Sequence, residues 1–231
     1  QLYCAAALPQ LGMQEEKNMQ IANLIMALPG AAAQGLIWGI MAIGVYITYK
    51  ILDLADLTVD GTMCTGGAVC VMLLMAGFPV PLALAGAFGA GMLAGLATGI
   101  FHTVMGIPAI LAGILSQLGL YSINLRIMGS KANQAISVDK YNLLVSLRYI
   151  KNVAFYKNTI FVVIVFIAVI VALLYWFFGT ELGCAIRATG SNPNMSRAQG
   201  INTNVSKIIG LMLSNGIVAL SSGLYAQYQG F

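Results

Sequence analysis

Long uncharged apolar segments dominate the hydrophobic pattern of this chain. Four segments contain no Asp, Glu, Lys or Arg: residues 18–49, 61–125, 158–180 and 208–231. A membrane-spanning helix needs about 20 predominantly apolar residues. The segments therefore hold about six helices when the longest is divided into three. We predict an all-α fold, a polytopic transmembrane helical bundle, with spans near the following residues: 31–49, 66–78, 81–101, 109–125, 160–178 and 208–231.

Small residues inside two of these segments indicate close helix packing. Gly35 and Gly39 form a GxxxG motif in the first predicted span, a spacing that lets helices approach closely. In the third span, Ala or Gly recurs every four residues, at positions 83, 87, 91, 95 and 99. We expect both stripes to lie at helix–helix contacts.

Three carboxylates lie between the first two predicted spans. Asp53, Asp56 and Asp60 follow one another at spacings of three and four, which would place them on one face of a helix. A charged side chain at the bilayer centre costs about 2.5 to 3.5 kcal/mol, so these residues must be interfacial or line an aqueous cavity. One interpretation is a solvated helix end. The other is that Asp56, Thr58 and Asp60 lie beside a translocation pathway.

The polar segment 179–207, between the last two spans, begins with the pattern of a short helix. Thr180 is a suitable N-cap residue. Glu181 in the first turn and Arg187 in the last would both interact favourably with the helix dipole. Gly190 supplies a left-handed residue that would end this helix.

The same segment continues with the pattern of a second short helix. Asn192 is a suitable N-cap, Pro193 is favoured at the first helical position, and Gly200 would end the helix. Two capped helices between two spans are too regular for a loose linker. They predict a structure that docks on something outside the membrane.

Composition excludes several classes of protein. Only 8% of the 231 residues are charged and 59% are hydrophobic, whereas about 25% of residues in an average soluble domain are charged. The net charge of +4 comes from basic residues scattered singly between the predicted spans, so we expect no nucleic-acid partner. The longest polar stretch, residues 126–157, has six basic residues against one acid and is predicted to be a loop.

Enzyme and metal-site patterns are also missing from the sequence. The four cysteines lie far apart without a CxxC pair, which indicates neither a disulfide framework nor a metal site. No GxxxxGK[ST], HExxH or GxSxG motif occurs, so we predict no catalytic residue and no cofactor bound by this chain. Energy for any active process would have to come from a partner.

The polar segment resembles a known family. Gly183, Arg187-Ala188, Gly190 and Asn192-Pro193, followed by Ala198 and Gly200-Ile201, match the pattern G-x-x-x-R-A-x-G-x-N-P followed by A-x-G-I. This is similar to the cytoplasmic pattern of permease subunits of ABC importers of the branched-chain amino acid and ribose type. Asp56-Leu57-Thr58-Val59 is similar to the D-L-S-V of ribose-type members, although Asp60 intervenes here before Gly61.

The resemblance covers roughly residues 30–231, and it implies a division of the chain. Residues 1–29 would be an N-terminal leader and pre-span segment, without the basic region of a secretory signal. Residues 30–231 would be the transmembrane permease domain, with 179–207 as a cytoplasmic coupling segment. Members of the family continue with further spans, so we expect C-terminal spans of the family to be absent here.

The resemblance further implies that residues 180–201 are coupling helices that insert into a groove of an ATPase. The residues assigned to this contact are Glu181, Gly183, Arg187, Ala188, Gly190, Asn192, Pro193, Arg197 and Gly200. Arg187 and Arg197 would pair with acidic groups of the partner. The alternative is an interfacial hairpin whose arginines contact lipid phosphates.

The implied function is that of a membrane-spanning permease subunit of an ABC importer in the bacterial cell membrane. It would move a small solute, a hydrophobic amino acid in the closest branch, by alternating access. The implied partners are ATPase subunits that bind ATP, a second permease copy or homologue, an extracytoplasmic solute-binding protein and membrane lipid. Two alternatives stay open: a secondary, ion-coupled transporter with Asp53, Asp56 and Asp60 as ion sites, and a non-transporting scaffold.

Topology gives a further expectation. If residues 180–207 are cytoplasmic, residues 126–157 lie on the external side, against the positive-inside tendency. We give the motif more weight than this statistical rule. Residues 126–157 should then face the side of the membrane opposite residues 180–201. A re-entrant stretch at 141–150 would change the number of membrane crossings and reverse this assignment.

Overall fold

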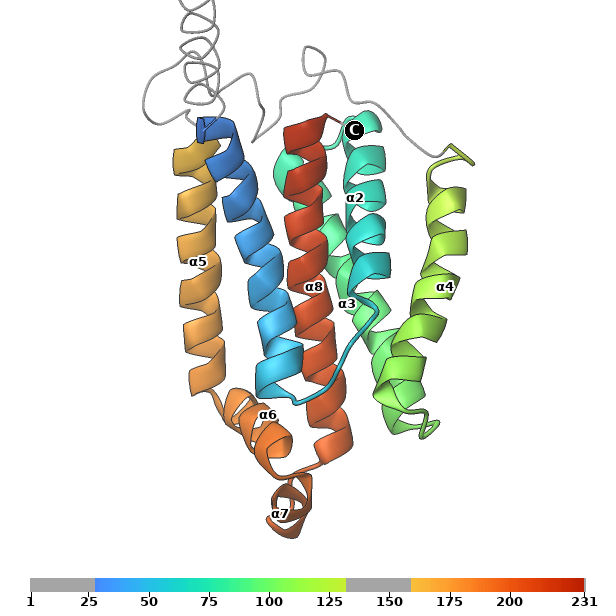
Figure 1. The fold of residues 1–231 in the computed structure, drawn as a ribbon, viewed down its shortest axis with the longest axis vertical. Coiled ribbons are helices and arrows are strands. Elements are labelled where there is room, and N and C mark those ends of the chain that lie inside the picture. The colour runs from blue at the N-terminus through green and yellow to red at the C-terminus, as the bar shows by residue number, and fades with distance from the viewer. Residues whose placement is uncertain (1–27, 132–158, 231) are drawn as a thin grey trace, which may run out of the picture.

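The computed structural model describes residues 28–131 and 159–230, and every regular element in these residues is a helix. Five helices there are long and apolar enough to cross a membrane (Figure 1). They are the first helix (Leu28–Ile51), α3 (Val80–Thr103), α4 (Ala109–Ile127), α5 (Thr159–Gly179) and α8 (Thr203–Gln229). A further apolar helix, α2 (Val59–Met75), has 17 residues. The predicted all-helical transmembrane bundle is therefore confirmed, with one apolar helix shorter than the rest.

The first helix and α2 are separated by a break in the helical backbone. The last turn of the first helix, η1 (Ile47–Ile51), is π-helical, and residues 53–57 are not helical. Asp53 has a φ of 54°. The prediction that Asp53, Asp56 and Asp60 share one helical face is therefore wrong. Figure 1 shows this segment rising along the bundle before α2 begins partway up.

The start of α2 lies at Val59 rather than near Gly66, where the sequence pattern placed it. Oδ1 of Asp56 accepts a hydrogen bond from the Thr58 backbone N–H at 2.9 Å, which satisfies a donor at the helix start. Asp60 lies in the first turn, where a negative charge complements the helix dipole. Gly66 instead lies inside α2, where a Cβ atom would overlap the Ala219 backbone of α8.

The core of the bundle is the contact between α3 and α8. Ala83 and Ala87 are fully buried. A Cβ on Gly91 would overlap the carbonyl oxygen of Asn215, and a Cβ on Gly99 would lie 3.2 Å from Cα of Ile208. The predicted small-residue stripe of α3 is thus confirmed as a close helix contact. Of the most apolar 18-residue stretch of α8, 67% is buried inside the bundle. The corresponding value for α5 is only 11%.

The GxxxG motif of the first helix behaves differently. A Cβ atom on Gly35 or Gly39 would have no heavy atom within 4 Å, whereas a Cβ on Gly44 would lie 3.0 Å from the carbonyl oxygen of Ser214. Ser214 Oγ donates a hydrogen bond to the Gly44 carbonyl at 2.7 Å. Within the described residues, the predicted contact at Gly35 and Gly39 is therefore wrong. The first helix meets α8 at Gly44 and at the carbonyl of buried Ile37, which accepts a hydrogen bond from Ser221 Oγ at 2.8 Å.

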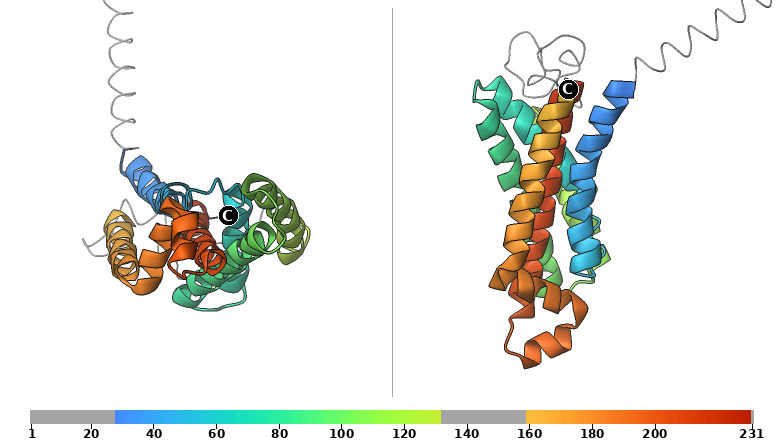
Figure 2. Two further views of the ribbon diagram at one scale, coloured as in Figure 1. Left: turned by 90° about the horizontal axis from the view of Figure 1, so that it is seen from below. Right: turned by 90° about the vertical axis from the view of Figure 1, so that its left-hand side faces the viewer.

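Two short helices, α6 (Glu181–Ser191) and α7 (Pro193–Ala198), project from one end of the bundle (Figures 1 and 2). The C-terminal end of α4 lies at the opposite end (Figure 1). This arrangement agrees with the predicted topology as far as residue 131. The leader up to residue 27, residues 132–158 and residue 231 lie outside the described residues.

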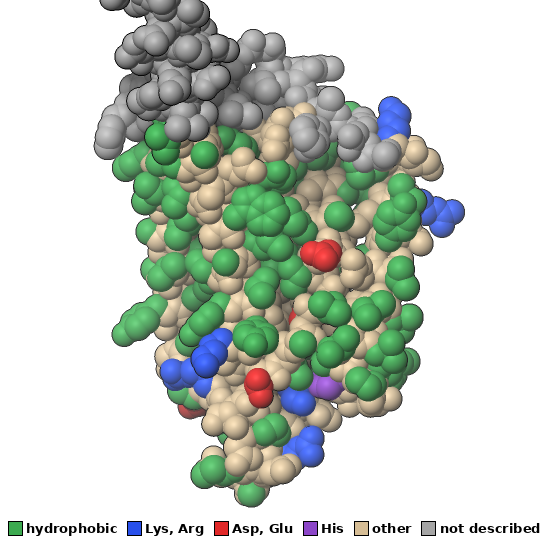
Figure 3. Space-filling model, viewed as in Figure 1, with side chains coloured by type: hydrophobic (Ala, Val, Ile, Leu, Met, Phe, Trp, Pro, Cys, Tyr) green, Lys and Arg blue, Asp and Glu red, His purple; other side chains and the backbone are tan. Residues whose placement is uncertain are grey.

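Surface chemistry follows the bundle axis. Figure 3 shows a broad hydrophobic belt along the length of the visible face, with Lys and Arg side chains gathered towards the α6–α7 end and at the opposite edge. Charged residues avoid the hydrocarbon region of a bilayer because of their desolvation cost. Most of the face is thus suited to lipid and its ends to water or headgroups, although an acidic side chain near the middle interrupts the hydrophobic surface.

Candidate functional site

A buried polar cluster joins the broken segment after the first helix to α2 and α8. Oδ2 of Asp56 accepts a hydrogen bond from Asn215 Nδ2 at 2.7 Å. Oδ1 of Asn215 accepts one from Thr62 Oγ1 at 2.7 Å, and Asn215 is completely buried. With Thr58 N–H on its other oxygen, the Asp56 carboxylate has a partner on each oxygen.

Hydroxyl groups extend the cluster to α3 and α4. The hydroxyl oxygens of Thr58 and Thr98 lie 2.8 Å apart, and Thr98 Oγ1 donates to Ser116 Oγ at 2.8 Å. All three residues are buried. Buried polar groups need such partners because an unpaired one costs roughly 1 to 3 kcal/mol. The cluster therefore ties four helices to the segment that carries Asp56.

The predicted pathway residues divide between two places. Asp56 and Thr58 lie in the cluster, whereas Asp60 is exposed on α2. The Asp60 carboxylate makes no hydrogen bond or ion pair within residues 28–131 and 159–230. A hollow beside Asp56, lined also by Thr98 and His102, is too narrow for a water molecule. This hollow gives no water-sized passage to Asp56, which is itself half-buried.

Sequence reasoning missed four members of the cluster: Thr62, Thr98, Ser116 and Asn215. Each is a polar residue inside an apolar segment, which is a usable signal because such residues usually face the bundle interior. The pattern alone does not say which of them meet, since that depends on which helices are neighbours.

The cluster gives a stability prediction. Asn215→Leu removes the donor to Asp56 and the acceptor for Thr62, and it should lower the free energy of unfolding by roughly 1.5 to 3 kcal/mol, as for a hydrogen bond to a charged group. The measurement is unfolding of the purified protein in detergent. Thr65→Val is the matched control, because the Thr65 hydroxyl donates only to Gly61 O within α2. Equal effects of both variants would show that the cluster does not hold α8.

The coupling segment predicted at residues 179–207 begins as expected. Thr180 Oγ1 accepts a hydrogen bond from the Gly183 N–H at 3.4 Å and Glu181 lies in the first turn of α6. A Cβ on Gly183 would overlap the backbone of Phe177 and Phe178. Gly183 therefore lets the chain turn tightly from α5 into α6.

Gly190 does not end α6 in a left-handed conformation, so that prediction is wrong. The helix continues to Ser191 and ends at Asn192, whose backbone is extended (φ −152°, ψ 97°). Arg187 consequently lies inside α6 rather than in its last turn. A Cβ on Gly190 would overlap the Ile51 carbonyl oxygen and lie 3.0 Å from Cα of Leu52. Gly190 thus allows α6 to lie directly on the broken end of the first helix.

The second short helix follows the sequence prediction. Asn192 Oδ1 accepts hydrogen bonds from the N–H groups of Asn194 and Met195, both at 3.1 Å, and Pro193 is the first residue of α7. Gly200 has a φ of 85°, which ends the turn after α7. These local capping rules were sufficient to place α7.

Both arginines of the segment make contacts within the chain. A guanidinium nitrogen of Arg187 donates to the carbonyl oxygen of Phe178, the last turn of α5, at 3.1 Å. Arg197 Nε donates to Thr203 Oγ1 at the start of α8, at 2.9 Å. Both side chains are nevertheless exposed, and a guanidinium has five donors. Each arginine therefore keeps donors for another partner.

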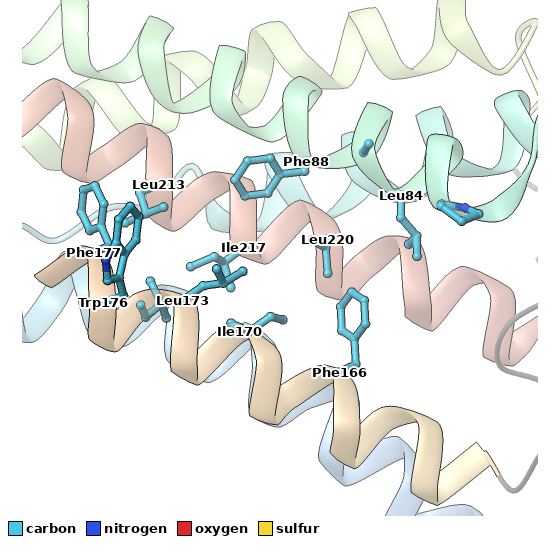
Figure 4. A pocket seen from close by; sticks show the side chains of 13 residues that line it. Leu84, Phe88, Phe166, Ile170, Leu173, Trp176, Phe177, Leu213, Ile217 and Leu220 are labelled. Carbon is cyan, nitrogen blue, oxygen red and sulfur yellow. The ribbon is translucent and has the colours of Figure 1, made fainter. Parts of the chain in front are cut away.

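A largely apolar cavity of about 590 Å³ lies between α5 and the α3–α8 pair. In Figure 4, Phe166, Ile170 and Trp176 reach from α5 towards the cavity, and Leu84, Phe88 and Ile217 lie across it. Apart from the indole N–H of Trp176, these side chains offer no hydrogen-bonding group to a charged or zwitterionic solute. The cavity is therefore not a candidate site for a polar solute.

Comparisons with known proteins place the chain among transport proteins. The family model described as "Branched-chain amino acid transport system / permease component" matches residues 28–231. The chain is 42% identical over 199 residues to a tyrosine transport system permease protein of Clostridioides difficile, covering 86% of this chain and 63% of the relative. No solved structure gives a significant match.

Two further relatives are less similar to this chain. An uncharacterized protein of Rickettsia prowazekii is 35% identical over 201 residues, covering 87% of this chain and 68% of the relative. A galactofuranose transporter permease protein of Escherichia coli is 28% identical over 174 residues, covering 73% and 47%. This chain thus spans about two thirds or less of the curated relatives it matches. It belongs to the family of permease components of branched-chain amino acid transport systems, and is a multi-pass membrane protein of the ABC transporter permease class.

Proposed function

We propose that this chain is the membrane-spanning permease subunit of an ABC importer, and that α6 and α7 dock on a cytoplasmic ATPase subunit. The observation that carries the proposal is that α6 and α7, both capped by side chains, project beyond the spans while α6 packs on the broken end of the first helix. A rigid projecting element transmits a push better than a flexible loop does.

The contacts suggest a route for that push. Gly190 of α6 lies against Ile51 and Leu52, and the Leu52 side chain is buried against Gly210 of α8. Four residues further along, the Asp56 carboxylate accepts a hydrogen bond from Asn215 of α8. Movement of α6 would therefore shift the segment after the first helix and the polar cluster together. In alternating access, ATP-driven closure of the ATPase subunits would use this connection to change the arrangement of the helices and open the pathway.

The remaining partners are part of the same proposal. ATP would be bound by the ATPase and not by this chain. A second permease copy or homologue would complete the pathway, and a solute-binding protein would dock at the end opposite α7. Asp56, Thr58 and Asp60 remain the proposed pathway residues, with Asp56 and Thr58 at the point where four helices meet.

We propose a hydrophobic amino acid as the solute. Support comes from the 42% identity to a relative described as a tyrosine transport permease, against 28% to one described as a galactofuranose permease. The experiment is titration of the cognate solute-binding protein with tyrosine, leucine and a pentose. Binding of the pentose alone would overturn the amino-acid assignment and leave the importer assignment intact.

Ion-coupled transport is the alternative that the Asp56 carboxylate keeps open. Uptake into vesicles separates the two functions. An importer requires ATP and the ATPase subunit, whereas a secondary transporter follows a proton or sodium gradient without them. Gradient-driven uptake by the chain without an ATPase would contradict the proposal.

Docking of the ATPase gives a direct mutational test. Arg197→Glu should lower retention of the ATPase about tenfold or more, because a charge-assisted hydrogen bond contributes roughly 1.5 to 3 kcal/mol. The measurement is co-purification of the ATPase with the permease from membranes. Thr203→Val is the matched control, since it removes the internal partner of Arg197 and keeps the positive charge. Unchanged retention with Arg197→Glu would indicate that α7 does not contact the ATPase through this residue.

A further inference from the structure

An apolar groove of about 530 Å³ separates the first helix from α5 near the α6 end of the bundle. Ile43 and Ile47 line it from the first helix, and Val171 and Leu174 line it from α5. Only 11% of the most apolar 18-residue stretch of α5 is buried. This helix therefore has exposed apolar side chains on its outer side as well as towards the groove. The space is thus suited to a hydrocarbon chain.

Towards α6 the groove continues into a polar hollow, also of about 530 Å³. The two spaces share Tyr46, Ile51 and Arg187. Lys50 and Asp53 also line the polar hollow. With Arg187 they give it two basic side chains and one acidic side chain, a formal net charge of +1. Basic pockets between transmembrane helices on the cytoplasmic side are typical sites for phospholipid headgroups.

Local geometry holds the cationic group at this junction. One nitrogen of the Arg187 guanidinium is bonded to the Phe178 carbonyl at 3.1 Å, which leaves other donors of the planar group free to meet an oxyanion. Tyr46, Tyr49 and Tyr175 around the two spaces are 58%, 70% and 85% exposed. Exposed tyrosines are typical of the boundary between hydrocarbon and headgroups.

We propose that one anionic phospholipid binds here, with an acyl chain in the groove between the first helix and α5 and its phosphate at Lys50 and Arg187. The argument is charge complementarity at the end of a hydrocarbon-lined groove. The lipid would fill the space between the first helix and α5, the two helices that α6 contacts. It would thereby stabilise the position of α6 against the end of the first helix. Asp53 opposes the phosphate, so removing its charge should strengthen binding.

The test uses the full-length permease in detergent, titrated with dioleoyl phosphatidylglycerol or dioleoyl phosphatidylcholine and followed by native mass spectrometry. Each cation near a lipid surface contributes about 1 kcal/mol, or about fivefold in affinity. Lys50→Gln should weaken phosphatidylglycerol binding about fivefold and Asp53→Asn should strengthen it by a similar factor. Lys207→Gln is the matched control, because Lys207 lies at the same end on α8 and does not line either space.

A photoactivatable phosphatidylglycerol with a diazirine in its acyl chain locates the lipid. Crosslinks are expected within residues 43–51 and 171–178. Equal binding by Lys50→Gln and Lys207→Gln, equal affinity for the two lipids, or crosslinks confined to other segments would each overturn the proposal. The last result would indicate that another part of the protein fills the groove. ATPase docking is tested separately through Arg197, so failure of one proposal is distinguishable from failure of the other.

Discussion

Gly190→Val is expected to abolish retention of the ATPase and ATP-dependent uptake while leaving the membrane spans inserted. The added Cβ would overlap the Ile51 carbonyl oxygen and approach Cα of Leu52. Both obstacles are backbone atoms, which cannot rotate away as a side chain can. Overpacking typically costs about 1 to 3 kcal/mol. Here α6 can avoid the overlap only by moving away from the end of the first helix.

The measurement is ATPase co-purification together with uptake in the same vesicles, with extraction of the membranes as the check on insertion. Gly179→Val is the matched control, because a Cβ at Gly179 has no heavy atom within 4 Å. ATPase retention below a tenth of the wild-type amount is expected for Gly190→Val alone. Normal retention would mean that docking of the ATPase does not depend on the contact between α6 and the first helix, and the proposed coupling route would be wrong.

Gly95→Leu is expected to have the larger effect on the fold itself. A Cβ at this position would overlap the Leu211 carbonyl oxygen and lie 2.9 Å from Cα of Met212. The substitution would therefore force α3 away from α8 along the contact that forms the core. We expect the free energy of unfolding to fall by about 3 kcal/mol or more, at the upper end of overpacking effects.

Thermal unfolding of the purified protein in detergent measures this loss. Gly89→Leu provides the control on the same helix, because a Cβ at Gly89 meets nothing within 4 Å. The control should unfold near the wild-type temperature, whereas Gly95→Leu should unfold well below it or fail to accumulate. Similar behaviour of the two variants would contradict the role of the α3 stripe as the backbone contact of the core.

The sequence by itself determined the features that depend on local chemistry or on the solvent. A bilayer offers no hydrogen-bonding partner to the backbone, so long apolar segments become helices wherever they occur. The spans at α3, α4, α5 and α8 follow from this rule. The caps at Thr180 and Asn192 and the left-handed Gly200 were also predictable, because each side chain or glycine serves backbone groups within a few residues.

Features that depend on which helices are neighbours were decided only by the tertiary structure. The glycine pattern could not distinguish Gly39, which faces open space, from Gly95, which meets a backbone. Gly190 shows the same limit: a local rule predicts a helix stop, whereas the observed reason for a glycine is the end of another helix about 140 residues earlier in the chain. The start of α2 and the union of Asp56 with Asn215 likewise arise from contacts across the bundle. Hydropathy and capping act over a few residues, and the position of one helix against another is set by packing of whole surfaces.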